Sequence, residues 1–229
     1  MTSAKDNDQY TIRIIDCSDF DQIIKCLNSV VETLDDSELF VAPSPEYIHT
    51  ILSGYGKIAG IFTNNYLVGF ASVVFPRRGK NNLGHYIGIN SETLLAVAQL
   101  EHFCVVPAFR GKGLAKKAIN FLLADLPSQY TILLSTVSPK NNQSLSIAFN
   151  RKQRIVSFKN IYGKDRYVMC CFLKDSTNYN YTQRVMVKST NVGEITRLLE
   201  LGYIGISFDE TNSSILFVKE ERVHEAVSD

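Results

Sequence analysis

The sequence predicts a mixed α/β fold. Short apolar, β-branched segments of strand length alternate along the chain with segments whose apolar residues recur at helical spacing. Two strand segments, 57–63 and 66–75, are joined through Asn64 and Asn65, and this pair favours a tight hairpin because asparagine tolerates positive φ. The segment 98–118, AQLEHFCVVPAFRGKGLAKKA, predicts a strand, a glycine-containing turn and the start of a helix.

The first half of the chain predicts a strand over 10–15, followed by two helices. Ser18, with Asp21 three places later, has the spacing of a helix start, and a wide apolar stripe follows it. Ser44 and Pro45 fit the cap and the first turn of the second helix. After the hairpin, a long connection over 77–97 is expected to hold one short helix capped by Ser91.

The second half predicts a strand over 130–137, a helix capped by Asn141 or Asn142, and strands over 155–158 and 167–173. From residue 176 the character changes, and a β-α-β-β unit follows a polar linker. We therefore predict a main domain over 1–175 and a small C-terminal α/β extension over 176–229. At about 45 ordered residues, the extension is too small to be stable alone, so we expect it to pack on the main domain or on a second copy in a homodimer.

Composition excludes several classes of protein. Of the 229 residues, 45% are hydrophobic and 21% charged, which are globular values, and the net charge is +1. Such a balance gives no field for nucleic acid or an anionic membrane, in spite of the local basic cluster Arg77, Arg78 and Lys80. No apolar run approaches the about 20 residues that span a bilayer, and the polar N-terminus is unlike a secretory signal. The five cysteines lack metal-ligand spacing, so we expect reduced thiols, a cytoplasmic location and no metal.

The turn from Arg110 to Ala115 carries the first functional signal. Gly111 and Gly113 lie where a strand gives way to a helix, so several backbone N–H groups are expected there without bulky side chains in the way. A helix start with free N–H groups favours a multiply charged anion such as a phosphate, and Arg110 and Lys112 add positive charge. An ordinary turn is the alternative interpretation.

With its flanks, this turn resembles the acyl-coenzyme A loop of the GNAT N-acetyltransferase family. The family pattern [QR]-x-x-G-x-[GA] is met by Arg110, Gly113 and Ala115. The resemblance covers roughly residues 10–174 and implies the GNAT fold, with a mixed, mostly antiparallel central sheet flanked by helices.

The resemblance also implies a cofactor, acetyl-CoA, and a set of residues that bind it. The pyrophosphate would lie on the turn and the pantetheine arm beside the preceding strand, where the N–H near Val105 would polarise the acetyl carbonyl as an oxyanion forms. The implied cofactor-binding residues are Phe103, Cys104, Val105, Arg110, Gly111, Lys112, Gly113, Leu114, Ala115, Asn141 and Ser144. Leu114 is expected to contribute its N–H, since its side chain has a core position.

Glu101 is the candidate general base. An amine with a pKa of about 10 is protonated at neutral pH and must lose a proton before it attacks. In a number of GNAT enzymes a glutamate at the corresponding place removes it, and an acid within an apolar strand needs an explanation. A structural carboxylate paired with a cation is the alternative. Strict alternation would place His102 and Cys104 on the opposite face of the strand from Glu101.

One departure from the family concerns the general acid. Many members have a tyrosine in the helix after the second apolar strand, and here that place falls on Ala148, or on Phe149 with a slip of one residue. Either another tyrosine supplies the proton, with Tyr162 and Tyr167 nearest in sequence, or the thiolate leaves unaided.

The function implied is transfer of an acetyl group from acetyl-CoA to an amine of a small molecule or peptide by direct attack. Cys104 has no neighbouring base in the sequence, so an acyl-enzyme is not expected. The alternative is a CoA-binding sensor or assembly module of the same fold that has lost turnover.

Overall fold

The computed structural model describes residues 10–174 and 179–222. By their internal contacts these residues form two compact units. The first comprises residues up to 36, 42–75 and 100–127, and the second comprises 37–41, 76–99 and the residues from 128 onward. The expected boundary after residue 175 stays a prediction. The predicted N-terminal tail (1–9), part of the linker and the last residues (223–229) lie outside the described ranges.

The first unit is built on an antiparallel meander of β1 (Thr11–Ile14), β2 (Gly56–Thr63) and β3 (Tyr66–Val74). The predicted hairpin is confirmed, because Asn64 and Asn65 have φ values of 46° and 66° and close the turn between β2 and β3. The later residues of β4 (Val97–Val105) also belong to this unit.

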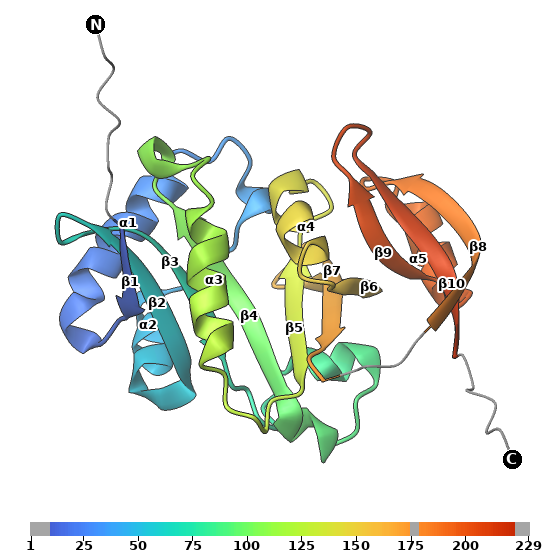
Figure 1. Ribbon diagram of the computed structural model, residues 1–229, viewed down its shortest axis with the longest axis horizontal. Coiled ribbons are helices and arrows are strands. Elements are labelled where there is room, and N and C mark those ends of the chain that lie inside the picture. Colours follow the sequence, from blue (N-terminus) through green and yellow to red (C-terminus); the bar gives the residue numbers. More distant parts are fainter. Residues whose placement is uncertain (1–9, 175–178, 223–229) are drawn as a thin grey trace, which may run out of the picture. The chain divides into compact units, whose positions relative to one another are not determined.

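Three helices complete the first unit: α1 (Phe20–Val31), α2 (Pro45–Thr50) and α3 (Leu114–Ala124). α3 packs against β2 and β3, in front of them in Figure 1, and α1 packs against β3. The predicted cap of the first helix at Ser18 is wrong. A 3₁₀ turn over Cys17–Asp19 precedes α1, and Asp16 caps that turn in a capping box with Asp19. The N-cap residue of α1 itself is Asp19, which makes no side-chain capping bond. α2 starts as predicted, with Ser44 accepting from the N–H of Tyr47, and it continues as a π-helix over Ile51–Tyr55.

The second unit holds the start of β4 and six further strands. The start of β4 pairs in parallel with β5, from Val97–Ile132 to Gln99–Leu134, and the other recorded pairs are antiparallel. From β4 the order is β5 (Ile132–Val137), β7 (Lys164–Phe172), β6 (Arg154–Ile161), β9 (Ile204–Asp209), β10 (Ser214–Arg222) and β8 (Tyr179–Lys188). A single recorded pair, Ile155–Gly205, joins β6 to β9.

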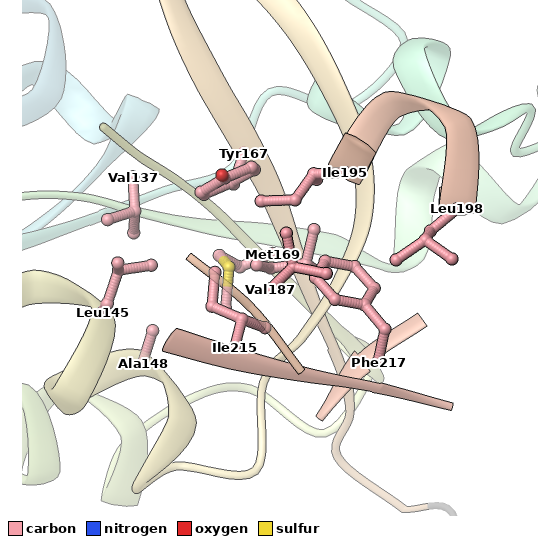
Figure 2. Packing of buried hydrophobic residues seen from close by; sticks show 11 residues of the cluster. Val137, Leu145, Ala148, Tyr167, Met169, Val187, Ile195, Leu198, Ile215 and Phe217 are labelled. Atoms are coloured by element: carbon pink, nitrogen blue, oxygen red, sulfur yellow. The ribbon is translucent and has the colours of Figure 1, made fainter. Parts of the chain in front are cut away.

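The C-terminal strands share a core with residues that precede the linker, as Figure 2 shows. α5 (Val192–Glu200) contributes Ile195 and Leu198, and α4 (Asn142–Phe149) contributes Leu145 and Ala148. The other buried members of this cluster are Val137, Ile155, Tyr167, Met169, Val187, Ile215 and Phe217. The expectation that the extension packs on earlier parts of the chain is therefore confirmed.

The long connection before β4 differs from its prediction. It holds two 3₁₀ helices, Leu83–Ile87 and Thr93–Ala96, in place of one short helix capped by Ser91. Asn82 is fully buried and caps the first of them, while its amide nitrogen donates to the carbonyl oxygens of Arg77 and Leu94. A buried polar side chain with several partners holds this connection in place.

Candidate functional site

The turn between β4 and α3 has the backbone that its glycines predict. Gly111 and Gly113 have φ values of 78° and 69°, in the left-handed region that favours glycine. A Cβ atom at either position would meet nothing within 4 Å, so the space above both residues is open. The turn is therefore shaped by its own backbone and leaves room for a ligand.

Several N–H groups at the start of α3 have no acceptor. Gly113 is the N-cap residue and offers no side chain to the first helical N–H groups. Within residues 10–174 and 179–222, the N–H groups of Gly111, Gly113, Leu114 and Ala115 donate no hydrogen bond. Such donors, together with the positive end of the helix dipole, form an anion-binding site.

The two basic side chains of the turn are held in different ways. Arg110 donates from Nε to the carbonyl oxygen of Val105 at 3.0 Å, which ties the turn to the end of β4. Lys112 donates from Nζ to the hydroxyl of Tyr10 at 2.8 Å and lies near the rings of Tyr10 and Phe109. Leu114 is buried, as its core position predicts.

The backbone at the end of β4 alternates between β3 and the opposite side. The N–H of His102 donates to Oγ of Ser72 on β3, and the N–H of Val106 donates to the carbonyl oxygen of Val68. In an antiparallel pair, alternate residues direct their backbone groups to the same neighbour. The N–H groups of Phe103 and Val105 therefore point away from β3.

Cys104 packs between β4 and its neighbours in the first unit. Its carbonyl oxygen approaches Gly69 on β3, and its buried thiol interacts with the thiol of Cys26 on α1. That hydrogen bond and burial raise the pKa of the Cys104 thiol well above its usual value. Little thiolate is therefore expected at Cys104, and its contact with a cofactor stays a prediction.

Glu101 lies against an aromatic residue of α2. The hydroxyl of Tyr47 donates to Oε2 of Glu101 at 2.8 Å, and Nδ1 of His102 lies 3.7 Å from the same oxygen. The ring centroids of Tyr47 and His102 are 6.1 Å apart. The strict alternation predicted for this strand is therefore wrong at Glu101 and His102, because both side chains approach Tyr47.

The surroundings of Glu101 keep His102 neutral. Burial lowers the pKa of His102 to about 4, so its contact with Glu101 is not an ion pair at neutral pH. Burial, and then the charge of Glu101, raise the pKa of Tyr55, whose ring lies 6.2 Å from that of Tyr47. The carboxylate therefore accepts a hydrogen bond from a tyrosine hydroxyl, and the structural alternative of a paired cation stays a prediction.

In the second unit, both polar atoms of the Asn141 side chain make hydrogen bonds within the protein. Its Oδ1 accepts from the N–H of Ser144 at 2.9 Å, which caps α4, and its Nδ2 donates to the carbonyl oxygen of Leu39 at 3.1 Å. Ser144 is half-buried in the first turn of α4. The Asn141 amide therefore fixes the helix start and the segment 37–41, and its direct contact with a cofactor stays a prediction.

The two tyrosines considered as general acid differ in exposure to solvent. Tyr167 is fully buried and donates to the carbonyl oxygen of Ser189 at 2.5 Å, and burial raises the pKa of its hydroxyl. Tyr162 lies in the β6–β7 turn and is 53% exposed. The two positions that match the family tyrosine offer no hydroxyl, because Ala148 is a core residue and Phe149 stacks on Phe208.

One functional candidate escaped the sequence reasoning: Tyr47, the partner of Glu101. Nothing in the sequence pairs Tyr47 with a residue that lies 54 positions away.

The described residues lack two further features. No cluster of three or more histidine, cysteine, aspartate or glutamate side chains with the makings of a metal site occurs among them. Their helices are also too short or too polar for any one to cross a bilayer.

Comparison with known proteins identifies one matching family and many solved structures with a similar fold. The sequence model of the Acetyltransferase (GNAT) family matches residues 27–149, more than half of the chain. A search of the curated proteins finds no match.

Solved structures give the fold at low sequence identity. A putative acetyltransferase, yncA, from Salmonella typhimurium, with its cofactor acetyl-CoA, superposes with a TM-score of 0.55 at 17% identity, over 74% of this chain and 97% of that one. The ribosomal-protein-S18-alanine N-acetyltransferase from Escherichia coli superposes with a TM-score of 0.55 at 13% identity, over 73% of this chain and 96% of that one. The diaminobutyrate acetyltransferase EctA from Paenibacillus lautus, in complex with its substrate and coenzyme A, superposes with a TM-score of 0.52 at 14% identity. The match covers 75% of this chain and 100% of that one.

Proposed function

Because the chain belongs to the Acetyltransferase (GNAT) family, we propose that it transfers an acetyl group from acetyl-CoA to an amine of a small molecule or peptide, by direct attack. The observation that carries the proposal is the set of N–H groups without acceptors at the start of α3, under open space at Gly111 and Gly113. Similar proteins solved with acetyl-CoA or coenzyme A support the choice of cofactor.

The residues of the turn suit a diphosphate. The N–H groups of Gly111, Gly113, Leu114 and Ala115 would hold its oxygens, with the helix dipole adding roughly half a positive charge. The N–H groups of Phe103 and Val105, which point away from β3, suit the carbonyl oxygens of a pantetheine arm. Arg110 keeps the turn in register with β4 through the Val105 carbonyl oxygen.

Acetyl-CoA would supply a thioester, an activated acyl group whose thiol has a pKa of about 8.5 by analogy with cysteine. The N–H of Val105 is our candidate for the donor that stabilises negative charge on the acyl oxygen. A donor of this kind contributes roughly 3 kcal/mol to a transition state. With Ala148 and Phe149 in the tyrosine position, we propose that the thiolate leaves without a dedicated acid.

Glu101 is our candidate general base. The amine must lose a proton before it attacks, and the Glu101 carboxylate can accept it directly or through a water molecule. Tyr47 orients that carboxylate through the hydrogen bond to Oε2, so we assign it a positioning role. His102 stays neutral beside Glu101 and adds no competing positive charge at neutral pH.

The test is free-thiol release from acetyl-CoA with a broad panel of amines. We expect turnover with some members of the panel, and a loss of about a hundredfold or more in kcat for Glu101→Gln with unchanged affinity for acetyl-CoA. Lys57→Gln, which removes an ion pair with Asp125, is the control and should keep its activity. Full activity in Glu101→Gln would exclude Glu101 as the base.

The second candidate function is a CoA-binding sensor without turnover. It is favoured by one observation, the absence of a tyrosine hydroxyl at Ala148 and Phe149, both of which pack in the core. Binding of acetyl-CoA with no thiol release across the amine panel would support the sensor over the enzyme.

Cellular location and assembly also belong to the proposal. All five cysteines are free, which agrees with a reducing compartment, and we propose a cytoplasmic protein. A homodimer stays a prediction that sedimentation of the full chain would test.

A further inference from the structure

Ser72 on β3 places a buried hydroxyl beside the residues around the candidate base. Only 1% of the residue is exposed. Its Oγ accepts a hydrogen bond from the backbone N–H of His102 on β4 at 3.1 Å, and it lies 3.4 Å both from Nδ1 of the ring and from the carbonyl oxygen of that residue. One hydroxyl therefore contacts the backbone and the ring of His102 together. Both residues belong to the first unit, as do Glu101 and Tyr47.

The acceptor for the His102 N–H is a side-chain oxygen, where a regular ladder uses backbone carbonyls. Four residues later on β4, the N–H of Val106 donates to the carbonyl oxygen of Val68 at 2.9 Å. Antiparallel register from that pair brings His102 opposite Ser72, so the serine side chain serves a position of the ladder. Strict alternation fails at the same place, because Glu101 and His102 approach one tyrosine ring of α2. The Ser72 hydroxyl therefore lies at the irregularity that sets the direction of Glu101.

His102 links Ser72 to the carboxylate. Its Nδ1 lies 3.7 Å from Oε2 of Glu101, and the hydroxyl of Tyr47 donates to the same oxygen at 2.8 Å. The side chains of Glu101 and His102 are 11% and 13% exposed, so neighbouring groups rather than water orient them. Burial lowers the pKa of His102 to about 4, and a neutral ring is not drawn to the carboxylate by charge at neutral pH. The position of the ring therefore depends on contacts such as that with Ser72.

We infer that Ser72 is a positioning residue for Glu101 that acts through His102, an inference that rests on the proposed acetyl transfer. The hydroxyl holds His102 on β4, and the ring of His102 and the hydroxyl of Tyr47 then confine Oε2 of Glu101 from two sides. A base held in one orientation meets the proton of a bound amine more often in the geometry that transfers it. In this role Ser72 touches neither the amine nor the cofactor.

The first test is steady-state thiol release by Ser72→Ala, which removes the hydroxyl without adding bulk. We expect kcat to fall by about tenfold or more, because a displaced base transfers the proton less often, with unchanged affinity for acetyl-CoA. Ser214→Ala is the matched control, since Ser214 is a buried strand serine on β10 whose hydroxyl donates to a carbonyl oxygen, and it should keep its kcat. A wild-type kcat in Ser72→Ala, or an equal loss in both variants, would overturn the inference.

The second test asks whether Ser72 and Tyr47 act on the same carboxylate. A double-mutant cycle compares Tyr47→Phe in wild type and in Ser72→Ala, with thiol release as the measurement. If both residues orient Glu101, Tyr47→Phe should cost about tenfold in wild type and less than about threefold in Ser72→Ala, because the carboxylate has already lost its orientation there. Losses that multiply would show two independent effects and would contradict the inference.

The third test needs no turnover and separates this inference from acetyl transfer itself. In urea unfolding, Tyr47→Phe should lower the midpoint less in Ser72→Ala than in wild type, since its hydrogen bond depends on where Glu101 lies. In Ser214→Ala it should lower the midpoint as much as in wild type. Equal shifts in all three backgrounds would overturn the inference. If the coupling is present and no amine is acetylated, the acetyl-transfer proposal fails and the placement of Glu101 by Ser72 stands.

Discussion

The hydroxyl of Tyr47 on α2 donates a hydrogen bond of 2.8 Å to Oε2 of Glu101 on β4. This bond joins two elements that are far apart in the sequence and fixes the one acid within the apolar strand β4. It also explains how Glu101 is tolerated there, since a buried carboxylate needs a donor in place of water. A positioning role for Tyr47 makes a direct prediction.

Tyr47→Phe should lower kcat/KM for thiol release by about tenfold, because a hydrogen bond to a charged group is lost while the ring remains. Affinity for acetyl-CoA should not change. Tyr66→Phe, on a side chain that is 74% exposed, is the control. Kinetics of Tyr47→Phe that match wild type would remove Tyr47 from the mechanism.

His102 predicts a pH dependence of stability. The unfolded chain protonates this histidine near pH 6.5, and the folded protein does so only near pH 4. Between these values the unfolded state holds more protons, so stability falls as the pH is lowered, by about 3 kcal/mol over the window. Urea unfolding of wild type and His102→Asn at pH 7 and pH 4.5 would measure it. The variant should lack this part of the slope, and equal slopes would show that His102 is not the group responsible.

Cys104→Ala should keep thiol release within about threefold of wild type and lose about 1 kcal/mol of stability, the usual size of a point-mutation effect. The reason is that its thiol packs against Cys26, with a raised pKa that leaves little thiolate. Steady-state kinetics and mass spectrometry check the claim. An acyl-enzyme that forms on wild type and disappears in Cys104→Ala would contradict direct attack.

Tyr167→Phe separates a structural tyrosine from a catalytic one. It should cost about 1–3 kcal/mol in free energy of unfolding, because the buried carbonyl oxygen of Ser189 loses its donor. Thiol release at a temperature where both proteins are folded should be unchanged. Tyr162→Phe, at the exposed β6–β7 turn, should alter neither quantity if the thiolate leaves unaided.

Local patterns in the sequence predicted the parts of the fold that depend on local physics. Asn64 and Asn65, Gly111 and Gly113 take positive φ because few other residues do so cheaply. The cap at Asp16 was missed, since Ser18 offered a similar pattern two residues later and only the 3₁₀ turn decides between them.

Contacts between segments that are distant in the sequence could not be predicted from sequence patterns. The bond between Tyr47 and Glu101 depends on where α2 lies against β4, and no local sequence pattern encodes the packing of residues 54 positions apart. The approach of both Glu101 and His102 to Tyr47 likewise breaks the simple alternation that a strand pattern assumes.

Calorimetric titration with acetyl-CoA tests the central claim most directly, because the claim is that N–H groups at the start of α3 hold the diphosphate. Wild type should bind. Gly113→Asn should also bind, because asparagine tolerates positive φ and the space above Gly113 is open. Gly113→Glu should bind about a hundredfold more weakly or not at all, since it sets a negative charge against the phosphates. Absence of binding by wild type, or equal binding by Gly113→Glu, would contradict the account.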